Sequence, residues 1–279
     1  MPNYPGVDGH GPVVLAYLED QQVLAACGSN GRKDQSCHQL SPGKPTVWEE
    51  MPPLVATHCH YQYRTRSHYL SGLGWFVLGH DESCDYSSDI QTELFTAEHQ
   101  WIKTPTTSPY PSASYPGSPC SVALNSTAII ITGGYSQDGQ LSATWLLDLT
   151  DYSWTRLRDM PGPRYTHGCM VTAEKEVLIA GGQDSDHPLS TVYIYSIENN
   201  IWRQAVDLPD GWKPTHYRFP VLFLWNDRPI LLEQLSNRLW ILQGKEEGWK
   251  QMEIPLGVGM FNGEQDSAIL VPRGAFNCI

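Results

Sequence analysis

The chain has 279 residues, of which 41% are hydrophobic and 17% charged, and its formal net charge is −12. This hydrophobic share is typical of a folded globular protein, while the acidic balance disfavours nucleic acid and membrane surfaces as partners. No run of 18 apolar residues is present, so we expect no membrane-spanning helix.

A tryptophan recurs at nearly constant spacing along the chain. The five residues Trp48, Trp101, Trp154, Trp202 and Trp249 lie 53, 53, 48 and 47 residues apart. Each closes a unit that contains strand-like runs, a pair of small residues and a polar loop. A period near 50 residues predicts a repeat fold in which each unit forms one small sheet.

The fourth unit shows how each sheet is expected to form. Four strands are predicted, over 168–173, 176–182, 191–197 and 202–208. The second run is continuously apolar, as in a strand that is buried on both faces. Gly181-Gly182 ends it, which indicates positive φ or a close backbone approach. The Trp opens the fourth strand and offers a large surface to a neighbouring sheet.

The order Gly-Gly, Tyr or Trp, Trp and then Met-Pro-x-Pro-Arg resembles the kelch repeat, which builds β-propellers. The match is clearest in units three and four; Cys27 replaces the first Gly in unit one, Gly79-His80 stands there in unit two and Glu233-Gln234 in unit five. The resemblance implies an all-β, kelch-type propeller that forms one domain over 1–279. Its five full four-stranded blades are expected at 11–54, 66–105, 119–160, 167–209 and 217–256.

The apolar run Ser267–Val271 predicts one further strand, which Pro272 stops. It fits the innermost strand of a sixth, incomplete blade, and kelch rings commonly close with strands from both chain ends. The first residues align with the segment that follows a fourth strand, so about 40 residues of a blade are expected to be missing. We favour an N-terminally incomplete sequence; alternatively, another chain completes the ring, or five blades close around the extra strand.

Several cysteines and one Asn suggest covalent modifications. Cys27 and Cys37 flank the loop between two neighbouring strands, within reach of a disulfide, so we predict that they are bonded; two separate thiols are the alternative. Cys120 and Cys169 enter the first strands of units three and four and are expected to be buried small apolar residues. Asn125-Ser126-Thr127 is a glycosylation sequon in a surface turn. These features favour a secreted or extracellular protein, with a cytoplasmic one as the alternative.

Residues 57–68, between units one and two, are rich in His, Tyr and Arg. His58, Cys59 and His60 are adjacent, and consecutive side chains of an extended chain point to opposite faces, so we expect no metal there. A loop that is solvated or contacts a partner is the expectation. Some kelch-like copper oxidases use two Tyr and two His with a Tyr–Cys crosslink, but no matching motif is present. Neither a P-loop nor a dinucleotide fingerprint occurs, so no cofactor is predicted.

Propeller strands carry the packing, so binding is expected in the loops that join strands and blades. The candidate binding residues are cationic or hydrogen-bonding groups in these loops: Arg64, Arg66, His68, Arg164, Tyr165 and His167. Arg and Tyr are frequent interface anchors, although Arg164 could instead cap neighbouring backbone carbonyls. We predict a non-catalytic scaffold that recognises a protein or a glycan through its rim loops, alone or in a larger assembly. The alternative is an enzyme, such as an oxidase or a sugar epimerase, with its site at the channel mouth.

Overall fold

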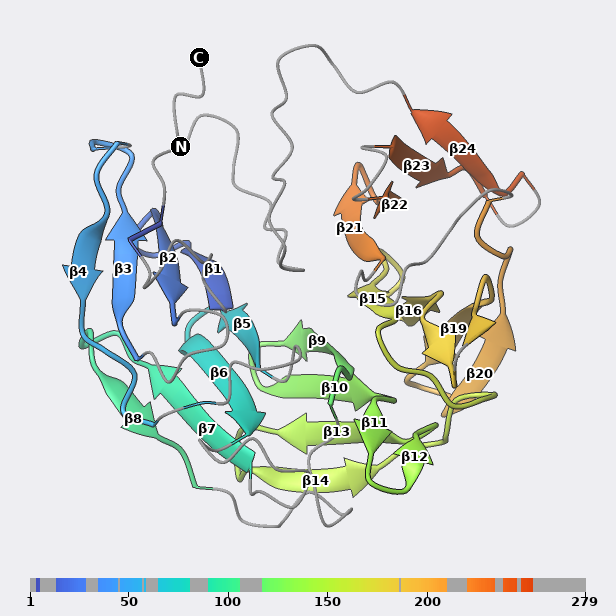
Figure 1. The fold of residues 1–279 in the computed structure, drawn as a ribbon, viewed down its shortest axis with the longest axis horizontal. Helices are drawn as coiled ribbons and strands as arrows, with labels where there is room; N and C mark the ends of the chain where they lie inside the picture. Colours follow the sequence, from blue (N-terminus) through green and yellow to red (C-terminus); the bar gives the residue numbers. More distant parts are fainter. Residues whose placement is uncertain are drawn as a thin grey trace.

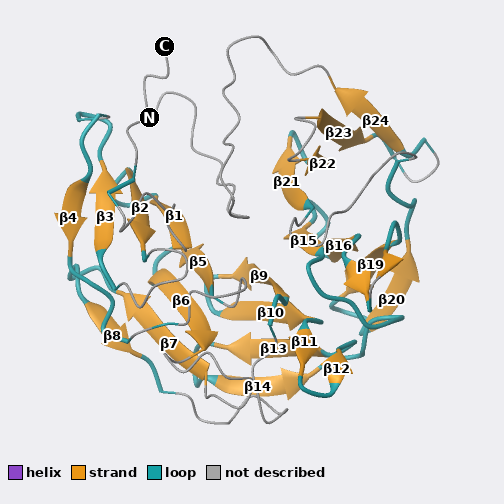
Figure 2. Cartoon of the chain, in the orientation of Figure 1, coloured by secondary structure: helices purple, strands orange, loops and turns teal. Residues whose placement is uncertain are grey.

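A computed structural model describes residues 4–5, 14–28, 35–44, 46–56, 58, 65–80, 90–105, 117–185, 187–209, 220–233, 238–244 and 247–252. Every regular element in these ranges is a β-strand (Figure 2). Among the described residues, therefore, no helix is long and apolar enough to cross a membrane.

The described strands form five four-stranded antiparallel sheets, which are the blades (Figure 1). Blade one contains β1 (Val14–Leu18), β2 (Val23–Cys27), β3 (Cys37–Leu40) and β4 (Glu49–Met51). Blade two contains β5 (Arg66–Leu70), β6 (Gly74–His80), β7 (Ile90–Phe95) and β8 (Trp101–Lys103). Blade three contains β9 (Cys120–Asn125), β10 (Ala128–Thr132), β13 (Thr144–Asp148) and β14 (Ser153–Arg156). Blade four contains β15 (Gly168–Val171), β16 (Val177–Ala180), β19 (Val192–Ser196) and β20 (Ile201–Gln204), and blade five β21 (Val221–Trp225), β22 (Arg228–Glu233), β23 (Arg238–Leu242) and β24 (Trp249–Met252).

Two small hairpins extend blades three and four. Between the second and third strands of blade three, β11 (Tyr135–Ser136) pairs with β12 (Gly139–Gln140). In blade four, β17 (Gln183–Asp184) pairs with β18 (His187–Pro188) at the equivalent place. The Asp138-Gly139 turn therefore closes a hairpin of its own.

The outermost strand of every blade begins at, or one residue from, the tryptophan that closes its unit. The prediction of an all-β propeller with five four-stranded blades is therefore confirmed. The predicted closing strand, Ser267–Val271, lies outside the described residues. Consecutive innermost strands contact one another in the order β1, β5, β9, β15, β21. Figure 1 shows the blades around one axis, with blades one and five flanking the part of the ring that the described strands do not occupy.

Apolar side chains pack between consecutive blades and form the core. Trp75 is fully buried between blades one and two, and Ile131 between blades two and three. Ile179 lies between blades three and four, and Leu231 between blades four and five. Each such side chain contributes roughly 1.5–3 kcal/mol by leaving water. Both faces of the middle blades are covered, which fits the apolar runs at 75–78, 129–131 and 177–180 in their second strands.

One repeated position of the innermost strand joins blades two, three and four to the blade that follows each of them. It pairs with the residue just before the pair of small residues and is Arg66 in blade two, Cys120 in blade three and Gly168 in blade four. Arg66 donates from Nε and Nη2 to the carbonyl oxygen of Pro119, at 3.1 and 2.8 Å. Gly168 lies against the carbonyl oxygen of Pro220, so that a Cβ there would overlap with it. Because side chains alternate along a strand, this position faces the following blade and its neighbours face the preceding one.

Cys120 forms a disulfide with Cys169, which links the innermost strands of blades three and four across a Cα–Cα distance of 6.0 Å. The expectation of two separate apolar cysteines is therefore wrong. The two positions differ by one residue in the repeat, since Cys120 pairs with Thr132 but Cys169 pairs with Ile179. That offset reverses the direction of the side chain. Cys120 consequently faces blade four, while Cys169 faces blade three.

Cys27 and Cys37 lie directly opposite each other on β2 and β3 and are bonded, with a Cα–Cα distance of 4.1 Å. Both are buried within blade one, whereas Cys120 and Cys169 are half-buried. Within the described ranges, one disulfide thus lies inside a blade and one joins two blades.

The glycine pairs of blades three and four lie under the chain segment that crosses from one blade to the other. Gly133 and Gly182 have φ of +61° and +87°. A Cβ on Gly182 would lie 2.6 Å from the carbonyl oxygen of Tyr165 and 2.8 Å from Cβ of His167. A side chain at this position would therefore be strained and would also displace the crossing chain.

We expect Gly182→Ala to lower the free energy of unfolding by about 2–5 kcal/mol, because positive φ and overpacking each cost about 1–3 kcal/mol. Gly162→Ala is the control: no atom lies within 4 Å of its Cβ position, so its effect should stay within about 0.5 kcal/mol. Urea unfolding of both variants measures the difference. Equal stability of the two would contradict the close approach.

We also expect the two disulfides to respond differently to a thiol reductant. The half-buried Cys120–Cys169 bond should be reduced before the buried Cys27–Cys37 bond. Alkylating the freed thiols at intervals and measuring the intact mass would show the order of reduction. The bond separations of 49 and 10 residues predict losses of about 4 and 3 kcal/mol when each pair is replaced by Ser. Simultaneous opening of both bonds, or a Cys120→Ser/Cys169→Ser chain as stable as the parent, would contradict this view.

Candidate functional site

Residues 160–167, here named the crossing segment, lead from blade three to blade four and carry three of the predicted binding residues. The backbone nitrogen of Arg164 donates to the carbonyl oxygen of Leu141 at 3.0 Å, and that of Gly134 donates to the carbonyl oxygen of Arg164 at 2.9 Å. One residue later, Tyr165 and Gln183 exchange two backbone hydrogen bonds, at 3.1 and 3.0 Å. The crossing segment is therefore hydrogen-bonded to both blades that it connects.

The side chain of Arg164 is directed into the protein and is 2% exposed. Its Nη1 donates to the carbonyl oxygens of Gly181 and Thr191, at 3.1 and 3.2 Å, and its Nη2 donates to Oγ1 of Thr191 at 3.0 Å. The guanidinium also lies 5.1 Å from the ring centre of Tyr193, a cation–π distance. Burial lowers the pKa of Arg164 to about 10, so the cation persists at neutral pH. The structure thus gives Arg164 the carbonyl-capping role.

His167 is likewise internal, with 1% exposure. Its Nε2 lies 2.7 Å from Oγ1 of Thr132, at the end of the second strand of blade three. Burial first, and then the positive charges of Arg164 and Arg66, hold the pKa of His167 well below its ordinary value. The ring is therefore neutral and joins two blades.

Arg66 and His68 connect blades two and three in the same manner. Besides the two bonds to Pro119, Arg66 donates from Nη1 to the carbonyl oxygen of Thr65 at 3.1 Å. His68 Nε2 lies 2.8 Å from Oγ of Ser121 on β9. Burial, with a smaller effect from Arg66, lowers the pKa of His68 to about 4. Arg64 lies outside the described residues.

Tyr165 reaches the two small hairpins. It is half-buried, and its hydroxyl donates to the carbonyl oxygen of Ser185 at 2.9 Å. Its ring packs on that of Tyr135, with centroids 5.8 Å apart and the planes at 60°. The exposed side chains around this pair are Gln137, Asp138, Ser185 and His187. We name these four residues, together with Tyr135 and Tyr165, the hairpin face.

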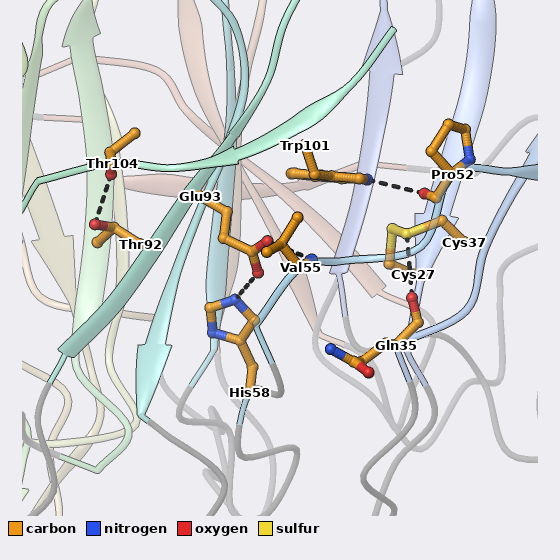
Figure 3. A network of polar contacts seen from close by, with 10 residues as sticks. All are labelled: Cys27, Gln35, Cys37, Pro52, Val55, His58, Thr92, Glu93, Trp101 and Thr104. Carbon is orange, nitrogen blue, oxygen red and sulfur yellow. Dashed lines mark hydrogen bonds and ion pairs between the residues drawn. A yellow bond between two sulfur atoms is a disulfide. The ribbon is translucent and has the colours of Figure 1, made fainter.

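A buried histidine–carboxylate pair holds the connection between blades one and two (Figure 3). His58 Nε2 lies 2.7 Å from Oε1 of Glu93, and both side chains are 0% exposed. The other carboxylate oxygen of Glu93 accepts a hydrogen bond from the backbone nitrogen of Val55 at 2.6 Å. The predicted loop that is solvated or contacts a partner is therefore wrong for His58, while Cys59 and His60 lie outside the described residues.

Glu93 was not identified from the sequence, although the repeat contains a signal for it. It pairs with Val77 on β6, and the matching residues of blades three, four and five are Trp145, Tyr193 and Trp240. The matching residue of blade one is Gln39. A carboxylate at a position that is aromatic in three of the other blades indicates a local polar contact. Aligning the third strands of the units would have shown this difference.

Among the described residues, no group of three or more His, Cys, Asp or Glu side chains could hold a metal ion. Asn125 is the exposed last residue of β9, at the other end of blade three from its hairpin. Of the predicted binding residues in the described ranges, Tyr165 is the one that borders the exposed hairpins, whereas Arg66, His68, Arg164 and His167 hold blades together.

A family model described as the KLHDC2/KLHL20/DRC7 Kelch-repeats domain matches residues 76–232. No curated protein matches the chain significantly.

His68 predicts a dependence of stability on pH. In the folded chain its pKa is about 4, against an ordinary 6.5, so the unfolded chain binds more protons between these values. Stability should therefore fall as the pH drops from 6.5 towards 4, by up to about 1.4 kcal/mol per pH unit. His68→Gln should reduce this slope in urea titrations, while His167, whose pKa is also lowered, continues to contribute to it.

Ser67→Ala is the matched control, because Ser67 on the same strand donates to the carbonyl oxygen of Leu15 in blade one at 3.3 Å and does not titrate in this range. It should shift stability equally at all pH values. A slope unchanged in His68→Gln would show that the ring is not held neutral.

Proposed function

Because this chain belongs to the kelch-repeat family of the KLHDC2/KLHL20/DRC7 domains, we propose that it is a non-catalytic binding module that takes a protein partner on the hairpin face. The observation that carries this proposal is the contact between Tyr135 and Tyr165, which sets the hairpins of blades three and four side by side. Tyrosines at the centre of a polar, exposed rim are typical of protein interfaces.

Backbone contacts preorganise the hairpin face. Leu141 donates to the carbonyl oxygen of Gly134, and Leu189 to that of Gly182, both at 2.9 Å, which closes each hairpin at its base. The Oγ of Ser136 also accepts the backbone nitrogen of Asp138 at 3.2 Å. A partner that binds ordered loops loses less conformational entropy than one that must order them. The smaller loss of conformational entropy favours recognition by the hairpins.

The other candidates have less support. A glycan is the second partner class, since exposed Gln, Asp and Tyr side chains can also bind hydroxyl groups, and a second chain that completes the ring is a further proposal. The enzyme alternative gains no support: the inward His68 and His167 both contact hydroxyl groups of neighbouring strands. We also propose secretion, which the two disulfides favour because such bonds persist in oxidising compartments.

The test is capture of the partner from extracellular fluid of the source organism by the immobilised chain. We expect a Gln137→Ala/Asp138→Ala/His187→Ala variant to retain at least fivefold less of the captured polypeptide, because truncating interface anchors typically costs more than about 1 kcal/mol. The control is Glu174→Ala, an exposed side chain in the turn between β15 and β16, at the other end of blade four.

Equal capture by the triple variant and the parent would overturn the assignment to this face. Loss of capture after glycosidase treatment of the fluid, with the polypeptide still present, would show that the partner is a glycan.

A further inference from the structure

The turn between β9 and β10 presents an amide nitrogen to solvent. Asn125, Ser126 and Thr127 are all exposed. Oδ1 of Asn125 accepts two hydrogen bonds from Thr127, one from the backbone nitrogen at 2.8 Å and one from Oγ1 at 3.1 Å. In the described part of the chain, Nδ2 of Asn125 makes no hydrogen bond. Both acceptor sites of the side chain are thus used locally, and its nitrogen points to water.

This geometry favours chemistry at the nitrogen. A hydroxyl that donates to the amide oxygen draws electron density towards that oxygen and supports the imidic form, in which the nitrogen is more nucleophilic. The contacts span only three residues, so the turn does not depend on the propeller being complete. An Asx-type turn of this kind forms in short segments, and it is therefore available while the chain is still being translocated.

We propose that Asn125 is an N-glycosylation site. Nδ2 attacks C1 of an oligosaccharide carried on a lipid diphosphate. The N–C bond forms as the C–O bond to the diphosphate breaks, the amide loses one proton, and the lipid diphosphate leaves. No redox partner is needed. The sequence contains one Asn-x-Ser/Thr motif, at Asn125, so a single glycan is expected.

The position of the turn keeps the glycan away from the hairpin face. β10 runs from Ala128, next to the turn, to Thr132, next to the hairpin β11–β12. At about 3.3 Å per residue, the strand separates these ends by roughly 15 Å. The glycan would therefore cover the opposite end of blade three. The proposal goes beyond partner binding and does not depend on it.

The folded chain accepts the glycan without losing a contact. The backbone carbonyl of Thr127 accepts the nitrogen of Leu149 at 2.7 Å, which involves no atom of the Asn125 side chain. The neighbouring turn, Thr150–Asp151, is exposed. Attachment at Nδ2 therefore buries no sugar and opens no cavity.

The experiment secretes the full chain from a eukaryotic host with an added leader and treats the folded product with peptide N-glycosidase. We expect the enzyme to produce one step in electrophoretic mobility, without denaturant, because the turn is exposed. The peptide mass spectrum should then show Asn125 converted to Asp. Asn125→Gln and Thr127→Ala should abolish the step. Thr127→Ser, which keeps the hydroxyl, and Ser126→Ala, which leaves both bonding residues intact, should retain it.

Secreted and folded parent chain with unmodified Asn125 would overturn the proposal. A step that persists in both Asn125→Gln and Thr127→Ala would overturn it as well. If one of these variants is not secreted, the other decides, since Thr127→Ala keeps the asparagine. Partner capture by unglycosylated chain, measured separately on the hairpin face, distinguishes failure here from failure of the proposed function.

Discussion

Blades two, three and four each meet the following blade through the same residue position of the innermost strand. Arg66 fills the position with a forked hydrogen bond to a carbonyl, Cys120 with a covalent bond and Gly168 with direct backbone contact. The three solutions differ in length, so consecutive blades need not be equally spaced. What they share is direction, because the alternation of side chains turns each of them towards the following blade.

The segments that cross between blades are also held at equivalent positions by different kinds of side chain. From blade three to four, the cation of Arg164 reaches over the ring of Tyr193. From blade one to two, the carboxylate of Glu93 occupies the place of that ring and binds Val55 and His58. In both cases a buried polar side chain anchors the crossing chain. This explains why Arg, Glu and His side chains near the crossings serve the fold.

The repeat made the fold predictable, because five tryptophans and the apolar second strands fix the period and the order of strands. The Cys120–Cys169 bond was missed because the two cysteines seemed equivalent, whereas an offset of one residue decides which face each one occupies. The binding residues were chosen for their charge, but the sequence does not show whether a cation near a turn points inward. Arg164 and His167 are both buried, and the glycine pairs leave room for the ring of His167. Tyr165 borders the exposed surface because its backbone pairs with β17.

The link between Cys120 and Cys169 also determines how the chain would carry tension. A force applied to the two ends would pass from β9 directly to β15 through the sulfur atoms of two cysteines that are 49 positions apart in the sequence. The residues between them would bear none of it. Those residues form nearly all of blade three, with the hairpin β11–β12 and the Asn125 turn. About 160 Å of extended chain therefore cannot be pulled out while the bond is intact. Blade three is the part of the propeller that mechanical load reaches last.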